Sequence, residues 1–317
     1  MSNKCYLTEV VLLTKSYNLQ DFEDWLHWYL DIIGFDHCHV FDNESLADIK
    51  SICNSYGDRV SYELVKGWPN QYALYNRYIN NESKAQWVLP IDDDEYLYVS
   101  DKYENNVAKF LTNWCQSHRD WNKICIGWRN LFPSKFTEER TNPHRILNAT
   151  AWSNEASQVW QAGNRPVKTF VCTAHKYEWT DRIGHSTHDP LIDGKYLPGK
   201  TIYGTIVKNS WQVAPTPDDA DLILYHYQFV SNQEWRYKCK NRKSPGSKSF
   251  IKDFPALYSR LYSFALKTDN RAASLFKRHP MPSWTDYCLA QEGSIQKMFP
   301  DKNIKNPVTF TEKNTVA

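Results

Sequence analysis

Short apolar segments alternate with segments of helical periodicity through the N-terminal half of the chain. EVVLLT at 9–14 and AQWVLPI at 85–91 are short and apolar, which predicts buried strands. The segment 18–34 lies between them and places apolar side chains, among them Phe22 and Trp25, at helical spacing. Strands that alternate with helices form βαβ units. We therefore expect an α/β fold, with a mostly parallel sheet flanked by helices.

The same patterns predict a full set of elements. Predicted strands are 9–14, 35–45, 59–65, 85–91, 123–129, 166–172 and 221–225, and predicted helices are 18–34, 46–56, 71–83 and 104–118. Asn18 is suited to cap the first helix with its side chain, and Gly34 is suited to end it.

The length of the chain bounds its domain organisation. At 317 residues it is long for one ordinary domain and short for two large ones. We expect one main domain over 1–240 and a helical C-terminal extension over 241–317. The polar, Pro- and Gly-bearing stretch NRKSPGSKSF at 241–250 would separate them.

Charge and cysteine content narrow the classes of protein. The chain has 38 basic and 36 acidic residues, a balance that does not indicate a dedicated nucleic-acid binder. Its eight cysteines include no CxxC pair and resemble reduced, buried thiols. There is no signal-peptide pattern and no run of about 18 apolar residues. We expect a cytoplasmic protein, and its basic segments 241–250 and 275–280 permit peripheral contact with a membrane.

Four adjacent acids, Asp92 to Glu95, follow the predicted strand 85–91 directly. In open parallel sheets ligands bind outside the carboxyl ends of the strands. Hard cations such as Mg²⁺ and Mn²⁺ prefer oxygen ligands and often take only one or two protein carboxylates plus substrate phosphates. The residues alone leave two interpretations open: a metal site, or a solvated turn with an acidic helix cap.

The block WVLPIDDDEYLYV at 87–99 resembles the W-x-x-x-x-D-x-D-E-F-L block of GT-A fold glycosyltransferases, closest to the family 92 and family 2-like group. Four other blocks resemble theirs in the same order: 13–45, QYALYNRYI at 71–79, IGWRNLF at 126–132 and ILYHYQFVSNQEWRYKCKNR at 223–242. The similarity covers roughly 7–242. It departs at Ser16 and Tyr17, where the family usually has Asn-Glu.

The resemblance implies a nucleotide-diphospho-sugar donor and a divalent cation, Mn²⁺ or Mg²⁺, that bridges its two phosphates. Asp94 and His226 would be the metal ligands, with Asp92 toward the ribose or the metal's waters and Glu95 as support. The other donor-binding candidates are Thr14, Lys15, Asp42, Asn43, Gln71, Asn76, Asp93 and Lys238.

Ordinary structural roles stay open for several of these candidates. His226 could simply pack between two tyrosines, and Asp42 and Asn43 could serve a turn. Lys238, in a basic cluster with Arg236, Lys240 and Arg242, could lie on a solvated helix face. Asn76 could contact the donor or face solvent.

Inverting transfer also needs a general base near the acceptor hydroxyl. Most of the candidate bases lie in HKYEWTDRIGHSTHDP at 175–190. Because a carboxylate is the usual base in the family, we expect Asp181, or next Asp189, to act as the catalytic base.

We therefore expect a metal-dependent glycosyltransferase that moves a sugar from a nucleotide-diphosphate donor, a UDP-sugar, to a glycan or lipid-linked acceptor with inversion. One alternative is a nucleotidyltransferase, which normally has a Gly-rich loop near its first strand, whereas LLTKSYN at 12–18 has no glycine. Another is a catalytically inactive carbohydrate-binding protein of the same fold. The sequence does not set the oligomeric state.

Overall fold

Four parallel strands form the centre of the fold. In the computed structural model, β1 (Tyr6–Thr14) lies between β2 (His37–Asp42) and β4 (Ala85–Ile91), and β2 also pairs with β3 (Val60–Leu64). Thr14 is opposite Asp42, and Leu12 is opposite Ile91. The carboxyl ends of these strands therefore meet at one edge of the sheet.

The structure describes most of the chain up to residue 281. The described residues are 6–67, 70–118, 121–133, 137–152, 167–180, 190–195, 197, 199–204, 206–207, 216–228, 230–241 and 267–281.

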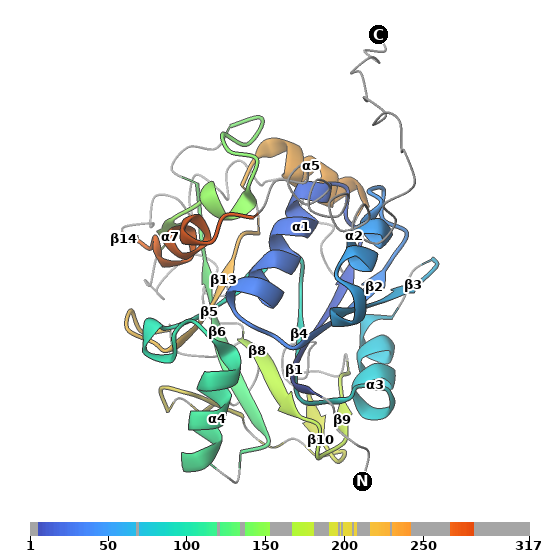
Figure 1. Ribbon diagram of the computed structural model, residues 1–317, viewed down its shortest axis with the longest axis vertical. Helices are drawn as coiled ribbons and strands as arrows, with labels where there is room; N and C mark the ends of the chain where they lie inside the picture. Colours follow the sequence, from blue (N-terminus) through green and yellow to red (C-terminus); the bar gives the residue numbers. More distant parts are fainter. Residues whose placement is uncertain are drawn as a thin grey trace, which may run out of the picture. The chain divides into compact units, whose positions relative to one another are not determined.

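Antiparallel strands enlarge the sheet beyond β4 (Figure 1). β8 (Val167–Cys172) runs antiparallel between β4 and β6 (Lys123–Asn130). β13 (Leu222–His226) pairs in parallel with β6 and antiparallel with β5 (Glu95–Val99). Two short strands, β11 (Gly199–Thr201) and β12 (Ile206–Val207), extend the sheet from β6. The chain thus returns from the end of β4 through β5, which brings β13 against the acidic turn.

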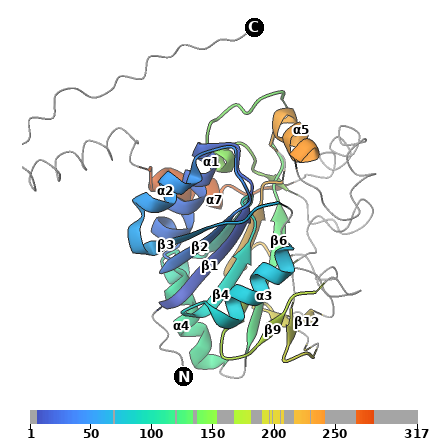
Figure 2. The same ribbon diagram turned by 90° about the vertical axis from the view of Figure 1, so that its right-hand side faces the viewer.

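Helices cover both faces of the sheet. α1 (Leu19–His27), its π-helical continuation Trp28–Ile32, α2 (Ile49–Ser55) and α4 (Val107–Ser117) contribute to one hydrophobic core, and α3 (Gln71–Asn81) contributes to another. Successive side chains of a strand point to opposite faces. Val10 and Leu12 of β1 accordingly belong to the first core, and Val11 belongs to the second. Figure 2 shows α3 on the other side of these strands from α1 and α2.

The remaining elements are short and mostly late in the chain. They are β7 (Ala151–Trp152) paired with β14 (Lys267–Thr268), β9 (Tyr177–Glu178) paired with β10 (Leu191–Ile192), the 3-10 turns Gly57–Arg59, Asp101–Tyr103 and Arg145–Leu147, and the helices α5 (Asn232–Asn241) and α7 (Arg271–Arg278).

The predicted α/β class and its mostly parallel, helix-flanked sheet are confirmed. Each predicted strand and helix is present, with ends shifted by a few residues. The Asn18 side chain accepts hydrogen bonds from the backbone N–H groups of Gln20 and Asp21, as expected of a cap. Gly34 has φ +77°, a conformation that favours glycine and ends the helix. The strand β5 was not predicted, because it begins at the last of the four acids, Glu95, without an intervening turn signal.

Of the predicted helical extension over 241–317, the structure describes Asn241, which ends α5, and residues 267–281. Within that part, Ala272, Leu275 and Phe276 of α7 are buried in the same core as α1. Residues up to His279 form one compact unit. The domain boundary at residue 240 stays a prediction. Among the described helices, none has the length and apolar character needed to cross a membrane.

A buried carboxylate lies within the central strands. Glu9 of β1 accepts hydrogen bonds from Tyr78 Oη at 2.6 Å and Ser83 Oγ at 2.5 Å, and its Oε1 is 2.6 Å from His37 Nδ1. His39 stacks on the ring of Tyr78 with centroids 3.8 Å apart. Burial raises the pKa of Glu9, but these three hydrogen bonds and the His37 charge outweigh it and lower the pKa.

His39 makes the stability of this region depend on pH. Burial lowers its pKa to about 3, opposed by the charge of Glu9 and aided by those of His37 and Arg77. In the unfolded chain the imidazole takes up a proton below its ordinary pKa of 6.5, whereas the folded protein keeps it neutral until about pH 3. The unfolded state therefore binds more protons in this window, and stability falls as the pH falls.

We expect His39 alone to remove about 2 kcal/mol of unfolding free energy between pH 7 and pH 5. The variant His39→Gln lacks this titration. It should be less stable than the parent at pH 7, because it loses the stacked ring, but the gap should shrink by that amount at pH 5. Urea unfolding of both proteins at the two pH values measures the gap. An equal gap at both values would contradict the assignment.

Candidate functional site

The sequence-predicted acids lie at the carboxyl edge of the parallel strands. Asp92, Asp93 and Asp94 form a turn between the end of β4 and the start of β5 at Glu95. Thr14 and Asp42 end the neighbouring strands at the same edge. The fold therefore brings together the ends of three separate predicted strands, in the place where open α/β sheets bind ligands.

Each aspartate of the turn has a partner supplied by the chain. Lys168 Nζ donates to Asp92 Oδ2 at 2.8 Å, and Gln71 Nε2 donates to Asp92 Oδ1 at 3.3 Å. Thr14 Oγ1 donates to Asp93 Oδ2 at 2.6 Å. Asp92 stays partly open, with a side chain 34% exposed, so it can reach a ligand while keeping its lysine.

Glu95 is fully buried and supports the turn. Its Oε2 accepts the backbone N–H of Asp92 at 2.9 Å and lies 3.4 Å from Lys168 Nζ. Burial raises the pKa of Glu95 well above its usual range, the charge of Lys168 opposes the shift, and that of Asp92 adds to it. Burial lowers the pKa of Lys168, but Asp92 and Glu95 more than reverse this and raise it. The predicted supporting role of Glu95 agrees with these contacts.

Asp94 lies beside both His226 and Lys238. His226 Nε2 is 3.5 Å from Asp94 Oδ1, and Lys238 Nζ donates to Asp94 Oδ2 at 2.6 Å. All three side chains are buried. β13 fixes His226 opposite Glu95 across the β5 pairing, and the His226 ring packs on Trp128 with centroids 4.3 Å apart. The histidine is thus packed in the interior and also faces the carboxylate.

This pair fits part of a divalent cation site. A carboxylate oxygen and an imidazole nitrogen are both ligand types that Mn²⁺ accepts. Nowhere in the described part of the chain do three or more His, Cys, Asp or Glu residues gather as a metal site. Asp94 and His226 could therefore supply two ligands, and a bound phosphate and water would have to complete the coordination.

A buried network of charges links the turn to two helices. Arg145 Nη1 donates to the carbonyl oxygen of Asp93 at 2.9 Å, and its Nη2 is 3.0 Å from Asp21 Oδ2 of α1 and 3.4 Å from Glu234 Oε1 of α5. Arg140 also forms an ion pair with Asp21, with its Nη1 2.5 Å from Asp21 Oδ1. α5, which carries Lys238, is held to the turn through this network.

Lys168 and Arg145 contact the acidic turn but were not among the site residues predicted from the sequence. Lys168 is the only charged residue in the predicted strand VKTFVC, and a charge in a buried strand needs a partner. That signal was available, although it does not tell which acid is the partner. Arg145 lies in the segment 137–152, whose sequence carries no comparable signal.

The candidates on the first two strands have mainly structural contacts. Asp42 accepts a hydrogen bond from Tyr62 Oη at 2.7 Å, and Asn43 Nδ2 donates to the carbonyl oxygens of Val65 and Gly67. Asp42 Oδ1 also accepts the backbone N–H of Ser45 at 2.8 Å in the turn after β2, so both residues have the turn contacts that were left open as their alternative. Lys15 is half-buried next to them.

Asn76 and the proposed bases complete the set of candidates. Asn76 donates from Nδ2 to the carbonyl of Trp179 and accepts from its N–H, so its amide serves to hold that strand end rather than face solvent. Its assignment to the donor stays a prediction. Asp181 and Asp189 lie outside the described residues, so both assignments as base also stay predictions.

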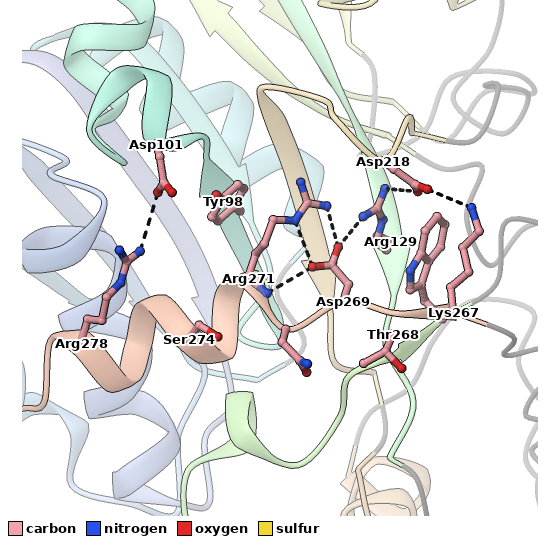
Figure 3. A pocket seen from close by; sticks show the side chains of 12 residues that line it. Tyr98, Asp101, Arg129, Asp218, Lys267, Thr268, Asp269, Arg271, Ser274 and Arg278 are labelled. Carbon is pink, nitrogen blue, oxygen red and sulfur yellow. Dashed lines mark hydrogen bonds and ion pairs between the residues drawn. The ribbon is translucent and has the colours of Figure 1, made fainter.

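A charged pocket of about 810 Å³ lies on the face of β6 and β13 that is opposite to the acidic turn (Figure 3). Arg129 and Tyr225 alternate with Trp128 and His226 along these strands and therefore point away from the acidic turn. Figure 3 shows their partner Asp269, to which Arg129, Tyr225 and Arg271 all donate.

Ion pairs neutralise the other basic side chains of this pocket. Lys267 Nζ is 2.9 Å from Asp218 Oδ2, and Arg278 Nη2 is 3.7 Å from Asp101 Oδ1. Burial raises the pKa of Asp269, but the Arg271 and Tyr225 hydrogen bonds and the arginine charges bring it down to about 2. We interpret the cluster as the attachment of α7 to the sheet.

Comparisons with known proteins do not establish a family. No protein family model and no curated protein matches the chain. Among solved structures, TarS 1-349 of S. aureus with UDP is 15% identical with a TM-score of 0.29, over 53% of this chain and 47% of that one. TarS 1-349 with UDP-GlcNAc is 11% identical with a TM-score of 0.30, over 85% and 70%.

A 4-diphosphocytidyl-2C-methyl-D-erythritol synthase from Anaerococcus prevotii is 10% identical with a TM-score of 0.30, over 53% of this chain and 71% of that one. The chain spans about half the length of TarS 1-349 in its structure with UDP. At such scores the likenesses support no functional argument.

We expect Lys168→Met to destabilise the protein by about 3 kcal/mol, because it leaves Asp92 and Glu95 without their shared cation. Adding Asp92→Asn should recover part of this loss, since it removes one of the two acids. Urea unfolding at pH 7 measures both. Lys84→Met, an exposed lysine just before β4, is the control and should change stability by less than about 0.5 kcal/mol. A similarly small effect of Lys168→Met would refute the role of Lys168.

Proposed function

We propose that the protein is a metal-dependent glycosyltransferase of the GT-A type, which moves a sugar from a UDP-linked donor to a glycan or lipid-linked acceptor with inversion. One observation carries the proposal. Asp94, the second acid of the D-x-D turn, and His226, from a distant block of the sequence, lie side by side at the carboxyl edge of the sheet. These are the two residues that the family resemblance assigns to the metal.

Asp94 and His226 would hold Mn²⁺ or Mg²⁺. When bound, the ion acts as a Lewis acid toward the leaving diphosphate. Lys168 binds one carboxylate oxygen of Asp92, and the exposed part of the Asp92 side chain would contact the ribose of the donor. Thr14 fixes Asp93, and the Arg145 bond to the Asp93 carbonyl fixes the backbone of the turn. These residues hold the ligands of the ion in place before the donor arrives.

The loop after β1 limits the donor contacts that can be proposed. Tyr17 packs against Tyr237 of α5, with ring centroids 3.9 Å apart and the rings tilted by 34°. Burial raises the pKa of Tyr17 to about 12, with Glu234 adding to the shift. Ser16 and Tyr17 stand where the family usually has Asn-Glu, so any contact of Tyr17 with the base would be by packing rather than by an amide or carboxylate.

The residues proposed to act on the acceptor come from the sequence alone. We propose that Asp181, or else Asp189, takes the proton of the acceptor hydroxyl. A cytoplasmic location with peripheral membrane contact would suit a lipid-linked acceptor. Nucleotidyl transfer is less well supported, because the loop that follows β1 has no glycine to approach a triphosphate closely.

We expect Asp94→Asn to weaken Mn²⁺-dependent binding of UDP by about 100-fold or more, because the amide is a poor ligand for the ion. Calorimetric titration of UDP with and without Mn²⁺ measures this. Asp58→Asn, an exposed acid in the turn Gly57–Arg59, is the matched control and should bind as the parent does. UDP binding that needs no metal and survives in Asp94→Asn would show that Asp94 is not a ligand.

Catalysis is tested separately from binding. The parent, incubated with a panel of nucleotide sugars and Mn²⁺, should release nucleotide diphosphate slowly even without an acceptor, by transfer to water. Asp94→Asn should release none above background. Binding of UDP and Mn²⁺ without any donor turnover would instead favour the carbohydrate-binding alternative.

A further inference from the structure

Lys238 neutralises the very carboxylate that is proposed to hold the metal. Its Nζ donates to Asp94 Oδ2 at 2.6 Å and also to the carbonyl of Gln228. The Lys238 side chain is only 9% exposed. Arg236, two residues earlier on the same helix, is 68% exposed and pairs with Glu138 outside the site. Lys238 therefore does not belong to a solvated helix face, the alternative that its sequence context allowed.

The ammonium and a divalent cation would compete for one carboxylate. Lys238 is bound to Oδ2 of Asp94, and His226 faces Oδ1 of the same group. An ion held between Asp94 and His226 would lie within a few ångströms of the ammonium, in a buried place where charges are weakly screened. The two cations repel each other there, so each weakens the hold of the other on Asp94.

The two lysines of the turn differ in their freedom to move. Lys168 lies on a central strand, is 1% exposed and contacts two carboxylates, Asp92 and Glu95. Lys238 lies on helix α5 and, among the described residues, forms an ion pair with the one carboxylate of Asp94, through a flexible four-carbon stem. A phosphate oxygen arriving with the ion offers Lys238 a second anionic partner close by. Only Lys238 is therefore placed to exchange.

We propose that Lys238 is the exchangeable counter-ion of Asp94. In the ligand-free protein it neutralises the buried acid, and on binding of the divalent cation it turns from Asp94 to the donor diphosphate. This inference rests on the proposed function, because it takes Asp94 as the metal ligand. Lys238 acts as a positioning residue for Asp94 and as a contact of the diphosphate.

The exchange predicts effects of opposite sign in two binding experiments. Without nucleotide, Lys238→Gln should bind Mn²⁺ about tenfold more tightly than the parent, because a competing cation is gone while the amide can still donate to Asp94. With saturating Mn²⁺, the same variant should bind UDP about tenfold more weakly, because the diphosphate loses a charged partner. Electron paramagnetic resonance of free Mn²⁺ and calorimetric titration of UDP measure the two affinities.

Two further variants serve as controls. Lys238→Arg keeps the positive charge and should leave the Mn²⁺ affinity close to that of the parent. Lys84→Met removes an exposed lysine at the opposite end of β4 and should change neither affinity. Thermal unfolding checks that each variant is folded, and if Lys238→Gln does not fold, Lys238→Met takes its place in both titrations.

The outcomes separate the inference from the proposed function. If the parent binds UDP and Mn²⁺ through Asp94 but Lys238→Gln binds Mn²⁺ no more tightly, the exchange is wrong and the proposed function stands. If Lys238→Gln gains Mn²⁺ affinity without losing UDP affinity, Lys238 does not turn to the diphosphate and the inference is also wrong. If the parent binds neither Mn²⁺ nor UDP, the proposed function itself fails.

Discussion

Lys168 and Lys238 reach the acidic turn from two different parts of the chain, a central strand and a surface helix. Four adjacent carboxylates at a sheet edge would repel one another, and two of them, Asp94 and Glu95, are almost completely buried. The two lysines supply the compensating charge from inside the protein. The course of the chain after β4 supplies both, because β8 and α5 each come back to the end of this strand.

The same compensation sets what the site can do. A carboxylate already paired with a lysine is held in one orientation, which favours binding of a ligand without reorganisation. It also means that an incoming divalent cation meets a partly neutralised acid instead of four free charges. The Arg145 network adds a mechanical link, since it joins the turn backbone to Asp21 of α1 and Glu234 of α5. Displacement of α5 would therefore move Lys238 and loosen the turn together.

Much of the fold could be predicted because its elements have local signals. The apolar run of β4 and the Asn18 cap each depend on a few neighbouring residues, and both are found where expected. β5 was missed because Glu95 begins it directly after the turn, where alternation of apolar and polar residues is absent: all five of its residues are buried. The antiparallel insertion of β8 between β4 and β6 was not predicted either, because strand order depends on pairing between distant segments.

The sequence by itself determined the elements, the edge at which the acids lie and, through a family resemblance, the pairing of Asp94 with His226. Hydrophobic periodicity, capping residues and strand ends are properties of short segments, so they can be read without a fold. Only the tertiary structure decided the partner of each acid. Lys168, Lys238 and Arg145 are far from the turn along the chain, and which carboxylate each one neutralises depends on burial and on distances that arise when the strands and helices pack.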